Sequence, residues 1–104
     1  MSQQILHREW VAKAEIHTES DETWVLNYFI PETETESGET LYGLRIEKSS
    51  PDGTLYEFQE TPFITNHREQ ALAMATAFAK GSVPPVTLLE MADEWLSELE
   101  SALV

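Results

Sequence analysis

The chain has 104 residues, of which 19 are acidic and 6 are basic, so its formal net charge at pH 7 is −13. A surface with this charge repels phosphate groups, which argues against direct binding to DNA, RNA or an anionic membrane. Cysteine is absent, which excludes disulfides and thiolate metal sites, and the N-terminus lacks the apolar run of a signal peptide. We therefore expect one cytoplasmic globular domain over residues 1–104, without a membrane-spanning segment.

Two extended segments are expected in the first third of the chain. Residues 9–18 alternate apolar and polar positions, which is typical of a half-buried strand, although Glu9 and the alanines also permit a helix here. Residues 23–30 are rich in aromatic and β-branched side chains and are apolar on both faces, which favours a central strand. We expect Pro31 to end this strand, and we expect the acidic residues 32–39 to form a mobile loop.

A β-hairpin is expected next. Its strands are residues 40–48 and 54–60, and Ser50-Pro51-Asp52-Gly53 between them has the composition of a tight turn, in which glycine accepts a positive φ. Gly43 lies within the first strand and indicates a bulge or the close approach of another backbone. The aromatic side chains of the second strand alternate with polar residues and are expected to face the core: Tyr56 and Phe58.

The first helix is expected over residues 66–80. Five alanines and other strong helix formers dominate this segment and place one apolar face at helical spacing. Asn66 is expected to cap the N-terminus through its side-chain oxygen. Lys80 followed by Gly81 is typical of a helix end, because glycine tolerates the left-handed conformation that often follows the last turn.

The second helix is expected over residues 87–103. Pro84-Pro85 prevents the first helix from continuing and fixes an extended entry. Thr87 and Glu90 have the spacing of a capping box. The apolar residues that follow form one stripe, in which Trp95 is expected to anchor the core.

These elements predict an α+β fold. Three or four antiparallel strands would form a meander sheet with one aromatic and aliphatic face, and the two C-terminal helices carry apolar stripes of their own. Because each layer needs the other to cover its apolar side, we expect two layers, with both helices on one face of the sheet. The sequence shows no internal repeat and no domain boundary.

Four short motifs in the second half of the chain stand out. They are Tyr42-Gly43-Leu44-Arg45-Ile46 in a strand, Ile64-Thr65 before the first helix, Val83-Pro84-Pro85-Val86-Thr87-Leu88 before the second helix and Asp93-Glu94-Trp95-Leu96 within it. Over residues 40–97 the chain resembles a family of small bacterial proteins of unknown function. The resemblance implies a bacterial protein in which strands precede helices. It implies no catalytic residue, because the family has no assigned activity.

The sequence lacks the motifs of the common catalytic and cofactor sites. It contains no nucleophile elbow, phosphate-binding glycine loop or dinucleotide fingerprint. Glu15 and His17 would share a strand face at a spacing that suits two metal ligands, but no third ligand accompanies them, so a solvated polar face is preferred. We therefore expect no catalysis, no cofactor and no metal.

Size, charge and the missing motifs favour a non-catalytic protein-interaction or regulatory module. Its surplus apolar residues are expected on the outer faces of the sheet, where Leu41 and Leu55 would pair across the hairpin. The partner would be a protein with a basic or apolar surface, or a second copy of the chain in a homodimer. The predicted interaction surface consists of Val25, Phe29, Leu41 and Leu55.

Two other functions are compatible with the sequence. An acidic decoy would mimic nucleic acid and block a basic surface, and its binding would weaken steeply with salt. The acidic surface also has a simpler explanation, which is solubility. A small-ligand-binding domain or minor enzyme would need a pocket between the sheet and the helices, for which the candidates are Tyr28, Tyr42, Tyr56 and Trp95.

Overall fold

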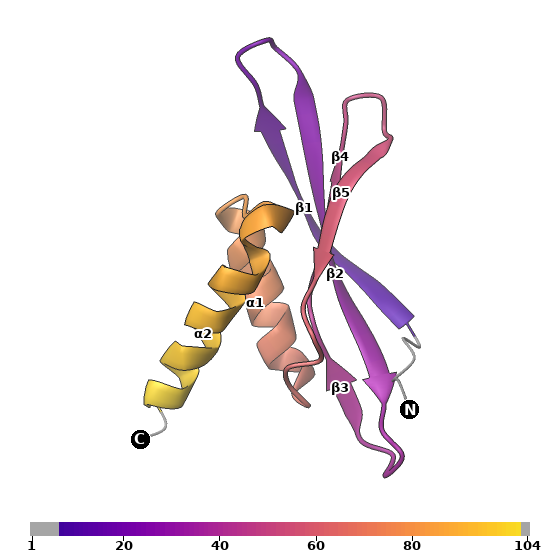
Figure 1. The fold of residues 1–104 in the computed structure, drawn as a ribbon, viewed down its shortest axis with the longest axis vertical. Coiled ribbons are helices and arrows are strands. Elements are labelled where there is room, and N and C mark those ends of the chain that lie inside the picture. The colour runs from indigo at the N-terminus through magenta and orange to yellow at the C-terminus, as the bar shows by residue number, and fades with distance from the viewer. Residues whose placement is uncertain (1–6, 103–104) are drawn as a thin grey trace.

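The computed structural model describes residues 7–102, in which an antiparallel sheet is followed by two C-terminal helices (Figure 1). The α+β class is thereby confirmed. Both helices lie on one side of the sheet, and the β1–β2 and β4–β5 hairpins project beyond them. The elements in chain order are β1 (His7–His17), β2 (Thr23–Glu34), β3 (Thr40–Tyr42), β4 (Arg45–Ser49), β5 (Leu55–Glu60), α1 (Arg68–Lys80), the 3-10 turn η1 (Pro85–Thr87) and α2 (Leu88–Ala102).

The sheet is built around β2, its longest strand. The strand order is β1–β2–β4–β5, every neighbouring pair is antiparallel, and β3 pairs with β2 beyond the end of β4. The strand expected over residues 40–48 is therefore two strands, which makes five strands instead of three or four. The break lies at Gly43, where a Cβ would be 3.0 Å from Thr61 Oγ1 and 3.1 Å from the Pro62 oxygen. The predicted close approach of another backbone to Gly43 is confirmed.

The first strand pair differs from its prediction at both ends. β1 pairs with β2 over its whole length, with a bulge between Trp10 and Ala12, so the helical alternative for residues 9–18 is wrong. β2 continues through Pro31 to Glu34, so the expected strand end at this proline is wrong as well. Pro31 is tolerated because it faces the gap between β3 and β4, where its carbonyl accepts a hydrogen bond from the Gly43 amide at 3.0 Å.

The loop expected over residues 32–39 is shorter than predicted, because its first three residues belong to β2. Residues 32–34 are paired with β3, and only the five residues from Thr35 to Glu39 connect the two strands. The Thr35 amide donates to the Glu39 carbonyl at 2.8 Å, and the Gly38 amide donates to the Thr35 carbonyl at 2.9 Å. These hydrogen bonds pair backbone groups of the turn with each other.

The second hairpin turn has the predicted form. Gly53 has a φ of +89°, and its amide donates to the Ser50 carbonyl at 2.9 Å. The Asp52 carboxylate accepts hydrogen bonds from the Ser50 hydroxyl and from the Thr54 amide, the latter at 2.9 Å. The bond from Ser50, followed by those from Thr54, lowers the pKa of Asp52 to about 2. The turn therefore fixes the start of β5.

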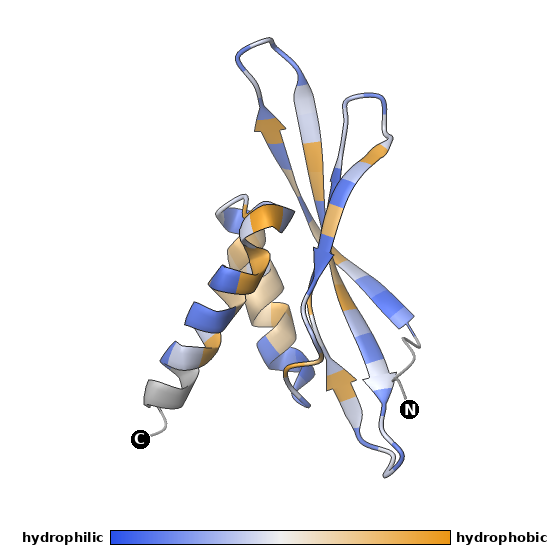
Figure 2. Ribbon diagram, in the orientation of Figure 1, coloured by the Kyte–Doolittle hydropathy of each residue, from blue (hydrophilic) through white to orange (hydrophobic). Residues whose placement is uncertain are grey.

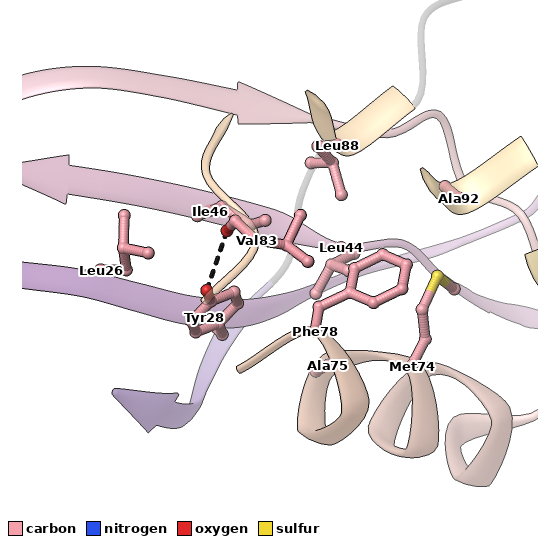
Figure 3. Close-up of a cluster of buried hydrophobic side chains, with 10 residues drawn as sticks. All are labelled: Leu26, Tyr28, Leu44, Ile46, Met74, Ala75, Phe78, Val83, Leu88 and Ala92. Carbon is pink, nitrogen blue, oxygen red and sulfur yellow. Dashed lines mark hydrogen bonds between the residues drawn. The ribbon is translucent and has the colours of Figure 1, made fainter. Parts of the chain in front are cut away.

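The hydrophobic core lies between the sheet and the helices (Figure 3). Tyr28 is its largest fully buried side chain, and the hydroxyl donates to the Val83 carbonyl at 2.8 Å, which ties β2 to the segment between α1 and α2. Burial raises the pKa of Tyr28 to about 12. The buried apolar residues of this cluster are Leu26, Tyr28, Leu44, Ile46, Met74, Ala75, Phe78, Val83, Leu88 and Ala92.

Helix α1 begins two residues later than predicted. Its N-cap residue is His67, whose amide donates to Thr65 Oγ1 at 3.0 Å. Asn66 precedes the N-cap position and does not cap the helix; its side-chain nitrogen donates to a Glu39 carboxylate oxygen at 3.3 Å. The predicted cap is therefore wrong, and Thr65 binds the first free amide in its place.

At the end of α1 the left-handed residue is Ser82 and not the expected Gly81. Gly81 has a φ of −89°, whereas Ser82 has a φ of +51° and occupies the left-handed position. The Val83 amide donates to the Phe78 carbonyl at 3.0 Å and the Ser82 amide donates to the Ala79 carbonyl at 3.1 Å, which is the bond pattern of a Schellman motif. The motif directs Val83 into the core.

Helix α2 covers less of the sheet than predicted. It follows η1 without a break, and Thr87 donates its hydroxyl to the Pro84 carbonyl at 3.3 Å, so the expected capping box at Thr87 is wrong. Trp95 packs edge-on against Phe78 of α1, with 6.0 Å between the ring centroids. α2 starts beside β5 and runs away from the sheet (Figure 1). The predicted helix end at residue 103 lies outside the described residues. No helix within residues 7–102 has the length and apolarity needed to cross a membrane.

Candidate functional site

The four residues predicted to form an interaction surface do not come together. Val25 and Phe29 are partly buried and alternate with the core residues of β2, so they face away from the helices. Leu55 lies opposite Ser49 in the β4–β5 hairpin and is 47% exposed. Leu41 pairs with Thr33 at the far end of the sheet, so the predicted contact between Leu41 and Leu55 is wrong (Figure 1).

The residues proposed for a ligand pocket are also dispersed. Tyr28 is fully buried, and Trp95 is held against α1. Tyr42 forms an isolated bridge with Thr65. Tyr56 is 65% exposed and lies beyond the helices, edge-on to Trp24 at 5.0 Å between ring centroids. These four side chains therefore do not line a common space.

The two residues considered as metal ligands do lie together, on one face of β1. His17 Nε2 is 3.9 Å from a Glu15 carboxylate oxygen. Within residues 7–102, no group of three or more histidine, aspartate or glutamate side chains is placed to hold a metal ion. The two side chains are exposed, at 71% for His17 and 45% for Glu15, and a contact of this kind on the surface contributes little to stability.

Exposed apolar side chains gather at one edge of the sheet, which we call the β5 edge. Among the described residues, six large hydrophobic side chains are exposed, and five of them lie on β5, η1 and the first turn of α2. Figure 2 shows these hydrophobic segments on β5 and at the start of α2. The β5 edge consists of Leu55, Tyr56, Phe58, Val86 and Leu89.

Two of these residues were expected in the core. Tyr56 and Phe58 are 65% and 52% exposed, so the prediction that both face inward is wrong. The β4–β5 register shifts between Lys48 and Ser49, which leaves Tyr56 as an extra residue in β5. The ring of Phe58 lies on the sheet face away from the helices. The sequence did contain one signal, because the last strand of a meander has no following strand to cover its outer edge.

A hollow of about 270 Å³ lies along this edge, between β5 and η1. Its lining is mixed, with Glu57, Phe58 and Gln59 of β5 on one side and Pro85 and Val86 on the other. Val86 is 77% exposed because the 3-10 turn buries Pro85 and leaves its neighbour outside. The one carboxylate in the lining, Glu57, is 3.9 Å from Lys48 Nζ.

The backbone of β5 is paired on one side only. The sheet ends at β5, and in the described part of the chain no further strand pairs with its outer side. The Thr61 amide donates to the Leu44 carbonyl at 2.8 Å. This bond shows which residues of β5 direct their backbone N–H and C=O groups toward β4. Because the direction of the peptide groups alternates along a strand, Gln59 points its backbone polar groups toward β4, whereas Phe58 and Glu60 point theirs outward.

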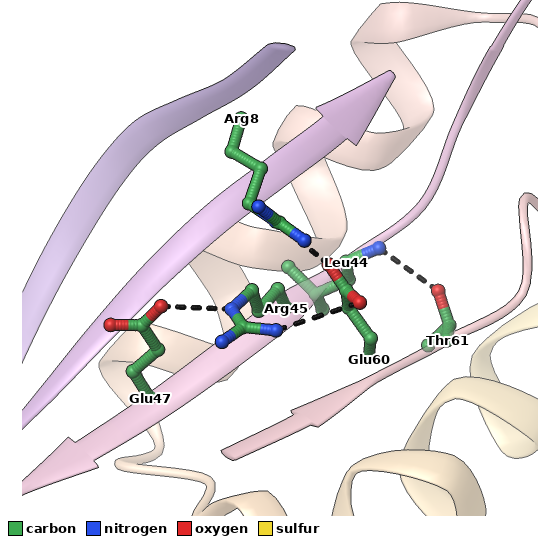
Figure 4. Close-up of polar contacts among 6 residues, drawn as sticks. All are labelled: Arg8, Leu44, Arg45, Glu47, Glu60 and Thr61. Atoms are coloured by element: carbon green, nitrogen blue, oxygen red, sulfur yellow. Dashed lines mark hydrogen bonds and ion pairs between the residues drawn. The ribbon is translucent and has the colours of Figure 1, made fainter. Parts of the chain in front are cut away.

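An ionic cluster on the open face of the sheet holds β5 in place (Figure 4). The side chain of Arg45 is only 10% exposed, and its nitrogens lie 2.8 Å from a Glu47 carboxylate oxygen and 3.5 Å from a Glu60 carboxylate oxygen. Arg8 reaches the same Glu60 at 3.0 Å. The Arg45 guanidinium also stacks 3.9 Å from the centroid of the Phe58 ring, as in a cation–π contact. The cluster thus orients Phe58 at the edge.

The elements around the β5 edge are strongly acidic. Together β5, η1 and α2 contain seven acidic residues and no basic residue. Two of the acids are neutralised by bases of neighbouring strands, since Glu57 faces Lys48 and Glu60 faces Arg45. The exposed acids of α2 between residues 90 and 94 have no base within ion-pair distance among the described residues. An apolar edge is thus flanked by uncompensated negative charge.

Comparisons with known proteins give one match. Searches of curated proteins and of solved structures gave no match to the chain. A family model, described as a family of unknown function (DUF6514), matches residues 7–98. This range contains every strand, α1, η1 and most of α2. The chain therefore belongs to DUF6514, a family of unknown function.

Proposed function

We propose that this protein is a non-catalytic protein-interaction module and that the β5 edge is its binding surface. The supporting observation is the concentration of exposed hydrophobic side chains beside the unpaired outer side of β5. Soluble proteins usually keep large apolar patches and open strand edges covered or interrupted by charge, because both promote association. A patch that combines the two features is suited to bind another protein.

The chemistry of the hollow supports binding and not catalysis. Its lining includes a single ionisable side chain, Glu57, which is engaged by Lys48. General acid–base catalysis needs a positioned group that can exchange protons with a substrate, usually assisted by a second group. A hollow of about 270 Å³ is also smaller than most small-molecule sites, which measure roughly 300–1,000 Å³. We propose the cytoplasm as its compartment, because the chain contains no cysteine.

Site-specific photocrosslinking in the native host tests this proposal. A benzoylphenylalanine at Val86 should capture a protein partner, whereas the same group at Thr76, an exposed residue of α1, should not. The purified partner should then bind the Phe58→Ser variant at least about tenfold more weakly, a loss of ~1.4 kcal/mol. Trp10→Ser is the matched control, because Trp10 is an aromatic residue of similar exposure on the opposite edge strand and its loss should leave the affinity unchanged.

Two results would contradict the proposal. One is equal capture from positions 86 and 76, which would show that the β5 edge has no preferred partner. The other is a partner whose affinity falls with Phe29→Ser or Trp10→Ser but not with Phe58→Ser. That partner would bind the open face of the sheet over β1 and β2, which includes Val25 and Phe29 of the surface that the sequence predicted.

A further inference from the structure

We propose that the β5 edge binds an extended segment of its partner as an additional strand, and that this segment alternates apolar with basic residues. This inference rests on the proposed function and specifies the partner. It follows from three independent properties of the edge, which are its backbone geometry, the size of its hollow and its charge.

The backbone of β5 is prepared for a further strand. Phe58 and Glu60 direct their N–H and C=O groups away from β4, and the strand is regular from residue 57 onward because its bulge lies earlier. Residues 55–60 contain neither lysine nor proline, the two residues that most often block an open edge. The other edge strand, β1, is protected, because it has a bulge after Trp10 and carries Lys13.

The hollow beside β5 has room for side chains of an added strand. It lies between β5 and η1, where Val86 offers an exposed apolar side chain, and its volume of about 270 Å³ suits one or two side chains of a peptide. In strand addition, backbone hydrogen bonds supply affinity, while pockets for alternate side chains supply specificity. The proposed alternation of apolar and basic residues follows from strand geometry, since every second side chain of the added segment would point to the side of the sheet that carries the hollow.

The charge of the edge distinguishes a basic partner from a second copy of the chain. Pairing of β5 with β5 of another molecule would bring together two copies of β5, η1 and α2, which in each copy contain seven acids and no base. A segment with lysine or arginine between its apolar residues would instead complement this negative charge, part of which is uncompensated because Glu90 and Asp93 of α2 form no ion pair among the described residues. Charge complementarity of this kind speeds association and discriminates against other partners.

Selection from a random peptide library tests the inference. Wild-type protein serves as bait, and Val86→Asp protein serves for counter-selection, because Val86 is 77% exposed and its replacement should leave the fold intact. The selected peptides should alternate apolar with basic residues. Binding of a selected peptide should slow hydrogen exchange of the Phe58 and Glu60 amides by at least about tenfold and leave the Gln59 amide, which already faces β4, unchanged.

Synthetic N-methylated versions of the selected peptide provide the second measurement. Methylation of the amides that face β5 should weaken binding roughly 5- to 100-fold, because each added strand bond contributes about 0.5–1.5 kcal/mol. Methylation of the alternate amides should have little effect. Peptides that are acidic, or that bind equally well in both methylated forms, would overturn the inference.

Failure of this inference can be told apart from failure of the proposed function. If a partner is captured at Val86 but no peptide survives counter-selection, the module binds a folded surface and the strand-addition proposal is wrong. A concentration-dependent dimer seen by light scattering, and abolished by Val86→Asp, would also overturn it, because the occupant would then be a second copy. If position 86 captures nothing, the proposed function itself is wrong.

Discussion

The hydrogen bond between Tyr28 and Val83 should make a measurable and pH-dependent contribution to stability. Replacing Tyr28 by phenylalanine removes the hydroxyl that donates to the Val83 carbonyl at 2.8 Å and leaves that carbonyl in a buried place without this donor. A lost bond of this type costs about 1–2 kcal/mol once the unsatisfied acceptor is included. In a domain of this size, the melting temperature should fall by roughly 5–10 °C.

The pH dependence follows from the raised pKa of Tyr28. Its pKa is about 12 in the folded protein, compared with 10.0 for the unperturbed side chain. Between these values the unfolded chain has lost the phenolic proton and the folded chain retains it, so the free energy of unfolding falls as the pH rises. The shift sets an upper limit of about 3 kcal/mol, and partial hydration of the site reduces the expected loss to roughly 1–2 kcal/mol.

Urea denaturation of both proteins at about pH 8 and about pH 11.5 tests these figures. The wild type should exceed Tyr28→Phe by about 1–2 kcal/mol at the lower pH, and the two should be nearly equal at the higher pH. Tyr56→Phe is the matched control, because its ring is 65% exposed and its loss should cost less than about 0.5 kcal/mol. A stability difference between wild type and Tyr28→Phe that is the same at both pH values would refute the reasoning.

Three further predictions concern stability and can be checked by thermal or urea denaturation. Ser82→Gly should stabilise the protein by about 1 kcal/mol, since Ser82 has a φ of +51°, which glycine adopts without strain. Gly81→Ala should not destabilise it, because the added Cβ would meet other atoms only at 3.8 Å or more. A loss of about 1 kcal/mol in Gly81→Ala would instead place the left-handed residue at Gly81. Gly43→Ala should destabilise by about 1–3 kcal/mol because of its crowding against Thr61; a neutral result would mean that the neighbouring chain yields. Arg45→Met should cost about 2 kcal/mol, since it leaves the Glu47 carboxylate without its base and the Glu60 carboxylate with Arg8 alone. A cost below about 0.5 kcal/mol would contradict the role of the ionic cluster.

The order and type of the elements could be predicted from the sequence because their signals are local. The alternation of residues 9–18, the Ser50–Gly53 turn and the alanine-rich helix are each read from a few neighbouring residues. Gly43 was informative for the same reason, since a glycine within a strand pattern indicates steric crowding. Pro31 was misleading, because a proline ends a strand only where its missing N–H would have been bonded to a neighbouring strand. Whether such a bond is needed at Pro31 depends on where β3 and β4 pair with β2.

The candidate site could be predicted only in part. Alternation separates the two faces of a strand, but it does not reveal which face the helices cover or how far they extend along it. Tyr56 and Phe58 were therefore assigned to the core, although α2 leaves the sheet near η1 and the bulge displaces Tyr56. The exposure of Val86 depends on the 3-10 turn, for which Pro84-Pro85 gave no specific signal. Of the predicted surface, only Leu55 belongs to the β5 edge.

The meander order of the sheet has a consequence for how the chain folds. Each strand pairs with a strand close to it in sequence, so no pairing requires a crossover connection or the closure of a long loop. Hairpins of this kind form in about 1–10 μs, and the sheet can grow outward from β2 before the helices dock. β5 is the last strand along the chain. Its outer edge is therefore exposed on the ribosome and in the folded protein alike, and an early encounter with a strand-forming partner would need no opening of the structure.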